Sequence, residues 1–108
     1  MESVINFTGV PGTTFRMAST DAAQYLTPAN LIDSNGKRAS AVLITFETNS
    51  IRVSYNATPT QGASGLGHLM PAGASYKISS PQAAQQFQFI SAANGVHGAI
   101  IVTSEFEV

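Results

Sequence analysis

The sequence predicts an all-β protein, an antiparallel β-sandwich of the jelly-roll type, with at most one short helix near residues 21–26. From residue 39 onward, short runs of alternating apolar and polar residues fill most of the chain. Turn-forming Gly, Pro and Asn residues separate these runs at close spacing, as in sheet proteins built from many short strands. The length of 108 residues suits one hydrophobic core, so we expect residues 1–108 to form one domain.

The first 17 residues are expected to form an edge of the fold. Apolar residues are frequent here, and Pro11-Gly12 interrupts them with a turn signal. We therefore expect residues 1–10 to form an N-terminal arm or edge strand, followed by a turn and a second short strand.

The next segment holds the candidate helix. Asp21 stands where it can cap a short helix over residues 21–26, with a glutamine three positions later. A proline follows at position 28 and would end that helix. Asn35-Gly36 then predicts a tight turn, of the type that favours positive φ at both positions.

Residues 39–48 and 51–57 are expected to form a β-hairpin across Asn49-Ser50. A two-residue connection would pair Glu47 with Arg52 on the exposed face. It would also place these alternate apolar residues together on the core face: Val42, Ile44, Phe46, Val53 and Tyr55.

Residues 85–92 and 96–108 are expected to form a second hairpin across Asn94-Gly95. Ile90 and Ile101 would lie together on its outer face without an apolar partner inside the chain. The core face would carry these residues: Phe87, Phe89, Ile100 and Val102.

Charged residues are scarce, and their scarcity is the main clue to function. Only 10 % of residues are Asp, Glu, Lys or Arg, against about 25 % in ordinary soluble domains. Between Val53 and Ser104 the single formally charged residue is Lys77. Because interface cores are depleted of Lys, Glu and Asp, this pattern favours a surface that other subunits cover. The alternative is a small neutral β domain with a Ser, Thr and Gln surface.

Composition also argues against several classes of function. The net charge of −1, without a basic stripe, argues against nucleic-acid binding. The chain has no cysteine, no secretory signal pattern and no apolar run that could span a bilayer. We expect a protein that stays in the cytoplasm, or in a particle assembled there, without binding a membrane.

No pattern predicts an enzyme, a cofactor or a metal site. The two histidines, His68 and His97, could serve as bases only in a Ser/His/acid arrangement that the sequence does not indicate. They also lack the short spacing of a metal site. Glu105 and Glu107 share one strand face and could hold a cation, but a solvated strand end is the favoured interpretation.

Residues 39–107 resemble a group of small all-β virion proteins of tailed bacteriophages, and are similar in size and texture to capsid decoration (cement) proteins. The resemblance rests on short segments: Ala41-Val42-Leu43-Ile44-Thr45, Ile51-Arg52-Val53, Pro59-Thr60, Gly67-His68-Leu69, Ala72-Gly73-Ala74-Ser75-Tyr76-Lys77-Ile78, Phe87-Gln88-Phe89-Ile90-Ser91 and Ile101-Val102-Thr103-Ser104-Glu105-Phe106. It implies a virion component on the capsid surface that reinforces the head lattice, with the major capsid protein as partner and a small homo-oligomer, such as a trimer, as the unit. No catalytic residues come with this resemblance.

Three regions are the candidate contact surfaces: an N-terminal arm at residues 1–10, the loop at residues 58–70, and the outer face of the second hairpin. Their contact residues are predicted to be Val4, Phe7, Pro59, Leu66, His68, Leu69, Met70, Ile90, His97 and Ile101. One alternative function is a carbohydrate- or receptor-binding module on a tail or fibre, for which Tyr25, Tyr55 and Tyr76 are the candidate aromatics. Another is a head–tail junction or tail component.

Overall fold

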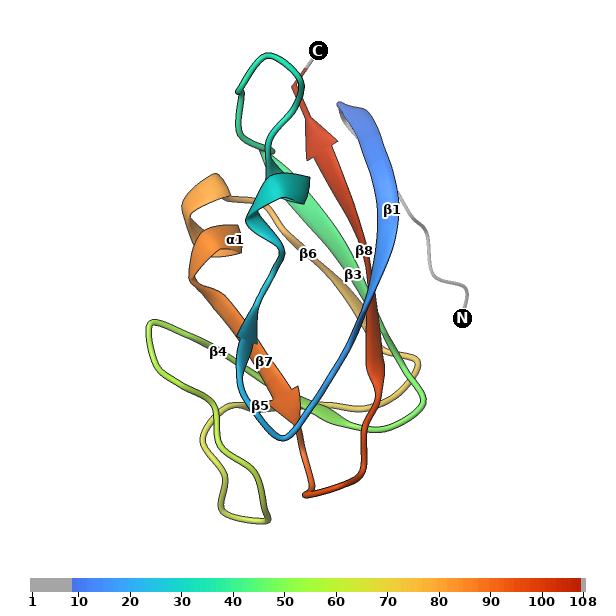
Figure 1. The fold of residues 1–108 in the computed structure, drawn as a ribbon, viewed down its shortest axis with the longest axis vertical. Coiled ribbons are helices and arrows are strands. Elements are labelled where there is room, and N and C mark those ends of the chain that lie inside the picture. The colour runs from blue at the N-terminus through green and yellow to red at the C-terminus, as the bar shows by residue number, and fades with distance from the viewer. Residues whose placement is uncertain (1–8, 108) are drawn as a thin grey trace.

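The computed structural model describes residues 9–107, which form two four-stranded antiparallel sheets packed against each other (Figure 1). The β8 sheet has the order β1-β8-β3-β6, with bounds Val10–Ala18, Ala99–Phe106, Ala41–Glu47 and Ser75–Ile78. The β7 sheet has the order β2-β7-β4-β5, with bounds Gln24–Tyr25, Phe87–Ser91, Ile51–Tyr55 and His68–Met70. The predicted all-β sandwich is confirmed.

The strand pairs are nested in sequence, as in a long hairpin rolled up on itself. Strand β4 pairs with β5, β3 with β6, β2 with β7 and β1 with β8, all antiparallel. Two further pairings, β3 with β8 and β4 with β7, complete the sheets. This connectivity of eight strands in two sheets is that of a jelly roll.

The core lies between the sheets, and the alternating apolar residues predicted for it are buried there. Both sheets contribute, and these eight side chains are at most 2 % exposed: Val42, Ile44, Phe46, Val53, Phe87, Phe89, Ile100 and Val102. Tyr55, predicted for the same face, lies at the margin and is 37 % exposed.

The prediction of a hairpin across Asn49-Ser50 is wrong, because β3 and β4 lie in different sheets. Thr48 has a φ of 75°, and the Asn49 backbone N–H donates to Glu47 O over 2.9 Å. This tight turn carries the chain from the β8 sheet to the β7 sheet. Glu47 consequently forms its ion pair with Arg16, at 3.6 Å, and not with Arg52.

The prediction of a hairpin across Asn94-Gly95 is wrong for the same reason. The tight turn itself exists, since Val96 N–H donates to Ala93 O over 3.1 Å, but β7 and β8 lie in opposite sheets. Ile90 and Ile101 therefore belong to different outer faces of the sandwich and do not form one surface.

The helix is also misplaced in the sequence prediction. Residues 24–25 form β2, and the α-helix is α1, Pro81–Gln86, where Ser80 Oγ accepts a hydrogen bond from Ala83 N over 3.2 Å. A 3₁₀ turn, η1, spans Pro28–Leu31. Proline is favoured at the first position of a helix, so the prolines at 28 and 81 begin these helical segments.

Two turn signals in the first 38 residues have different outcomes. Pro11-Gly12 lies inside the edge strand β1, at a bulge between Pro11 and Thr14, where the missing proline N–H costs no sheet pairing. Asn35-Gly36 does form a tight turn, in which Gly36 alone of the pair has positive φ, at 77°.

The two sheet-to-sheet connections at residues 48–50 and 92–98 lie against each other at one end of the sandwich, the lower end in Figure 1. Asn49 Nδ2 donates to His97 O over 2.8 Å. A Cβ at Gly98 would lie 2.5 Å from Asn49 O and 2.7 Å from Glu47 O. Only glycine therefore fits at position 98 without moving backbone.

We predict that Gly98→Ala destabilises the fold by about 1–3 kcal/mol, because the added methyl must displace the neighbouring backbone. The free energy of unfolding in urea measures this. The control is Val96→Ala in the same connection, which removes exposed atoms and should change that free energy by less than about 0.5 kcal/mol. Equal stabilities for the two variants would contradict the packing role of Gly98.

Candidate functional site

Arg52 holds the long β4–β5 loop, residues 56–67, against the outer face of the β7 sheet. Its Nη1 donates to Gly67 O over 3.0 Å and its Nη2 donates to Gly62 O over 3.1 Å. The Gly62 N–H in turn donates to Ala92 O over 2.9 Å, just beyond β7. The guanidinium thus holds the loop against the sheet by donating hydrogen bonds to two backbone carbonyl oxygens of the loop.

The same loop satisfies two further polar groups on this outer face. Ser54 Oγ and Gln88 Nε2 both donate to Ala57 O. Gln88 is 7 % exposed and Ile90, beside Arg52 in the register, is 6 % exposed. The outer face of the β7 sheet is therefore covered by the chain's own loop.

Two predicted contact residues are buried by this arrangement and do not lie on a contact surface. Pro59, itself a residue of the loop, is fully buried, and Ile90 is buried on the sheet that the loop covers. The prediction treated the loop as open because sequence spacing does not show which way a long connection folds. The sequence signal for this inward fold is Arg52, a lone arginine before a glycine-rich loop, but the predicted hairpin pairs Arg52 with Glu47.

Exposed apolar residues gather on both faces of the edge strand β5 and in the loop before it, and we call this region the β5 flank. Leu66 is 53 % exposed and Leu69 is 54 % exposed. Two shallow hollows, of about 210 and 390 Å³, share Tyr55 and His68 as lining. The flank comprises Tyr55, Leu66, His68, Leu69, Met70 and Tyr76, and brings together four of the predicted contact residues.

Tyr55 and Tyr76 join the two sheets across this flank. Their hydroxyl groups lie 3.3 Å apart, one on β4 and one on β6. Burial, together with the hydrogen bond between the Tyr55 and Tyr76 hydroxyl groups, raises the pKa of Tyr76 well above its usual range. Tyr76 is therefore neutral at physiological pH, and no Asp, Glu, Lys or Arg lines either described hollow.

The remaining predicted contact residues are scattered. Ile101 lies partly exposed on the outer face of the β8 sheet, between Arg16 and Thr45. His97 is exposed in the β7–β8 connection, at the end of the sandwich. Val4 and Phe7 lie outside the described residues.

A chain of polar contacts runs through the connection end of the sandwich. Ser19 Oγ lies 2.7 Å from Ser91 Oγ, which lies 2.8 Å from His97 Nδ1. Both serines are at most 1 % exposed, so a substrate could not reach either hydroxyl. The arrangement fits a structural role in tying β1 to the β7–β8 connection, where Gly98 N–H donates to Ser19 Oγ over 2.8 Å.

Asp21 ties two loops to the same end. Its Oδ1 accepts hydrogen bonds of 2.9 Å from Gln61 Nε2 and of 2.9 Å from Gly95 N. These bonds hold the pKa of the Asp21 carboxyl below its usual value of 3.8, and the bond from Gln61 has the larger effect. The residue predicted to cap a helix thus fastens the 56–67 loop to the β7–β8 turn.

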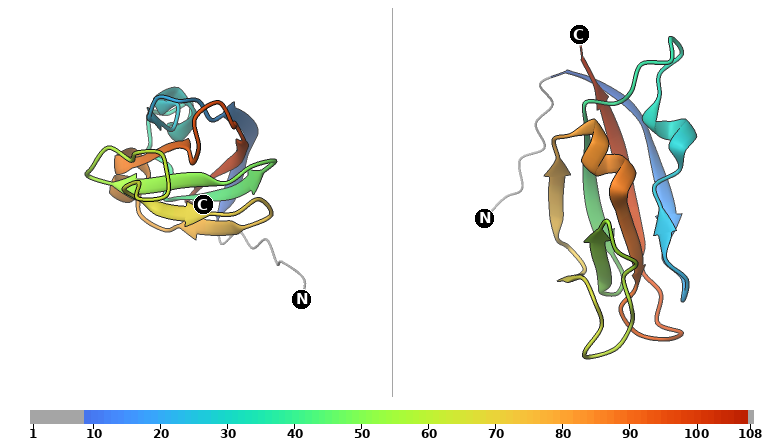
Figure 2. Two further views of the ribbon diagram at one scale, coloured as in Figure 1. Left: turned by 90° about the horizontal axis from the view of Figure 1, so that it is seen from below. Right: turned by 90° about the vertical axis from the view of Figure 1, so that its left-hand side faces the viewer.

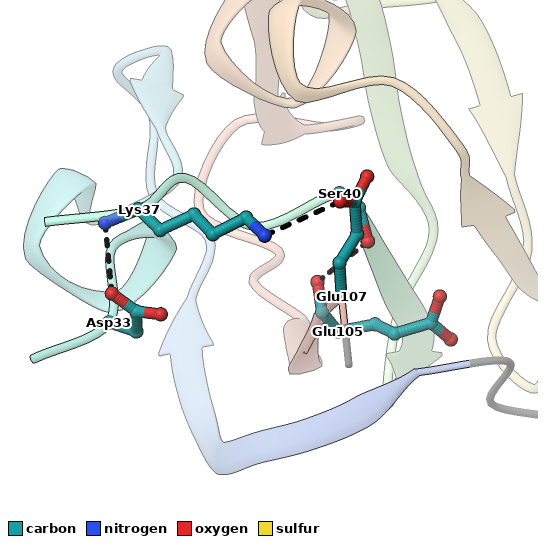
Figure 3. Close-up of polar contacts among 5 residues, drawn as sticks. All are labelled: Asp33, Lys37, Ser40, Glu105 and Glu107. Carbon is teal, nitrogen blue, oxygen red and sulfur yellow. Dashed lines mark hydrogen bonds and ion pairs between the residues drawn. The ribbon is translucent and has the colours of Figure 1, made fainter. Parts of the chain in front are cut away.

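Glu105 and Glu107 are each matched with a lysine. Lys77 Nζ lies 3.1 Å from Glu105 Oε1, and Lys37 Nζ lies 3.4 Å from Glu107 Oε2. Figure 3 shows Lys37 reaching from the Asp33 turn toward Glu107, while Glu105 points away. Within residues 9–107, no three His, Cys, Asp or Glu side chains gather as a metal site would require.

No protein-family model, curated protein or solved structure matches this chain. Among the described residues, no helix is long and apolar enough to cross a membrane. The geometry of the surface is therefore the main guide to function.

We predict that Arg52→Met loosens the 56–67 loop, because two loop carbonyls lose a charged donor. Amide hydrogen exchange should accelerate at Gly62 and Leu66, and the free energy of unfolding should fall by about 1–3 kcal/mol. The control is Arg16→Met, which removes an exposed ion pair and should cost at most about 1 kcal/mol without affecting the loop. Unchanged loop exchange in Arg52→Met would contradict this role.

We predict that Asp21 stabilises the fold above its unfolded pKa of 3.8, and that this contribution disappears as the pH falls through the lower folded pKa. Asp21→Asn should therefore be less stable than the parent at neutral pH. The gap in free energy of unfolding should narrow in strongly acidic solution, where the parent carboxyl is also neutral. A gap of constant size across that pH range would refute the assignment.

Proposed function

We propose that the protein is a structural virion component that works by subunit contact, most simply a capsid decoration protein of a tailed phage. The observation that carries the proposal is the β5 flank, where exposed apolar residues gather at a sheet edge around two hollows that no Asp, Glu, Lys or Arg lines. Contiguous exposed apolar patches on soluble proteins commonly mark protein–protein contacts. The resemblance of residues 39–107 to phage virion proteins gives the partner, the major capsid protein.

The edges of both sheets meet at this flank and support the same proposal. Among residues 9–107, strand β5 ends the β7 sheet and β6 ends the β8 sheet, so each presents one side without a partner strand from this described part. An incoming strand could pair with such an edge while Leu66 and Leu69 pack against the same partner. Strand addition with apolar packing is a suitable contact for a small homo-oligomer such as a trimer.

The jelly-roll connectivity is compatible with this role, by analogy at the level of the fold. Jelly rolls occur in viral capsid proteins and also in lectins and cupins, so the fold alone does not choose among them. On a symmetric shell, many copies act together, so that a modest contact per copy can give firm attachment.

The experiment is a measurement of self-association by size-exclusion chromatography with light scattering. We predict that the parent protein forms a small oligomer, and that the double variant Leu66→Asp/Leu69→Asp is a folded monomer, because it places charges inside the contact. The control is Val96→Asp, which changes a residue of similar exposure, 45 %, at the β7–β8 connection and should leave the oligomer intact.

A parent that stays monomeric at high concentration, and is absent by mass spectrometry from phage particles purified from its source, would overturn the proposal. Electron microscopy of such particles would test the location. Density on the capsid lattice is the expected result, and density in a ring at the head–tail junction or along the tail would contradict it.

A further inference from the structure

A second surface lies at the other edge of the β7 sheet, around Tyr25. This side chain is 56 % exposed on the two-residue strand β2, where Tyr25 pairs with Gln88 of β7. Two hollows flank Tyr25, and both share Tyr25 and Gln85 as lining.

The two hollows differ in chemistry. The first, of about 320 Å³, is mostly apolar and is lined by Tyr25, Leu26, Pro28, Leu31, Ile32 and Gln85. The second, of about 360 Å³, is mostly polar and is lined by Tyr25, Asn56, Ala57, Thr58, Gln85, Gln86 and Gln88. Each volume lies at the lower end of the range of small-molecule sites, about 300–1,000 Å³.

The amide groups of the polar hollow are available to a ligand. Within residues 9–107, the side chains of Gln85, Gln86 and Asn56 form no hydrogen bond. Gln88 uses its Nε2 on Ala57 O, which leaves its carbonyl oxygen. A side-chain amide both donates and accepts, so this group of amides can match hydroxyl groups in either direction.

We propose that this surface binds a neutral saccharide, with Tyr25 as the platform for one face of a sugar ring. Sugar rings combine an apolar face of C–H groups with a rim of hydroxyl groups, and the lining offers an aromatic ring beside an apolar hollow and a row of amides. Gln85, shared by both hollows, lies where it can bond the hydroxyl rim.

The charge of the lining selects among ligands. No Lys or Arg lines either described hollow, so a phosphate, sulfate or sugar carboxylate would lose its water shell without gaining a cation. The ligand class is therefore uncharged. A peptide that added to the sheet would find only two residues of β2 to pair with, which is too short a strand for stable addition.

This site and the proposed capsid contact lie on different edge strands. The order β2-β7-β4-β5 places Tyr25 of β2 and Leu69 of β5 at opposite edges of one sheet. The right-hand view of Figure 2 likewise shows β6, beside that flank, on the opposite side from β1 and β2. A copy attached through the β5 flank could still present Tyr25 to a sugar.

The test is a titration of the ¹⁵N-labelled protein, followed by NMR, with maltose, cellobiose, lactose and N,N′-diacetylchitobiose as separate neutral probes. At about 10 mM, a ligand with a millimolar Kd occupies most of the sites. At least one probe should shift the amide signals of residues 24–32 and 85–88. Glucuronic acid, the charged control, should not shift them.

Variants then test the platform. Tyr25→Phe keeps the ring and should bind like the parent, whereas Tyr25→Ala should weaken binding by about tenfold. Leu69→Ala, on the opposite edge strand β5, should bind like the parent. The proposal is overturned if none of the four neutral probes shifts those amides, if only the charged control does, or if Tyr25→Ala binds unchanged. The oligomer measurement described above is unaffected by any of these results.

Discussion

The fold depends on the pairing of β4 with β5, because every other hairpin pair is nested around it. Strand β4 supplies five residues and β5 only three, and the 56–67 loop that joins them would otherwise be a long, open tip. The guanidinium of Arg52 closes that tip by binding Gly62 O and Gly67 O. A single side chain on the central strand thus fixes the innermost turn and covers one face of the sheet.

The opposite end of the roll depends on close backbone packing. The chain passes between the sheets at residues 48–50 and 92–98, and the two passages touch at Gly98. Asn49 and the Ser19–Ser91–His97 contacts add hydrogen bonds at the same place. These hydrogen bonds hold the two sheets together at their connections.

Sequence reasoning could find which residues face the core but not which strands pair. Phe46 and Val53 point into the interior whether their strands form a hairpin in one sheet or cross between two sheets, so the alternation is the same. What separates the two arrangements is the backbone of Thr48, which has a φ of 75°. Threonine is not a residue type from which a positive φ can be predicted. The site was predicted in part for a similar reason: Leu66 and Leu69 are exposed as expected, whereas Pro59 is buried because the loop folds inward.

The scarcity of charged residues between Val53 and Ser104 has more than one cause, so it does not by itself mean that other subunits cover this part of the surface. Part of the uncharged stretch is covered by the chain itself, since the 56–67 loop and the outer face of the β7 sheet bury each other. Self-coverage accounts for Ile90 and Pro59 but leaves Leu66 and Leu69 exposed near β5. Outside that stretch, at the other edge of the same sheet, Tyr25 of β2 is exposed beside side-chain amides. Exposed leucines suit a protein neighbour and a tyrosine beside amides suits a hydroxyl-rich ligand, which is why we propose different partners for the two edges.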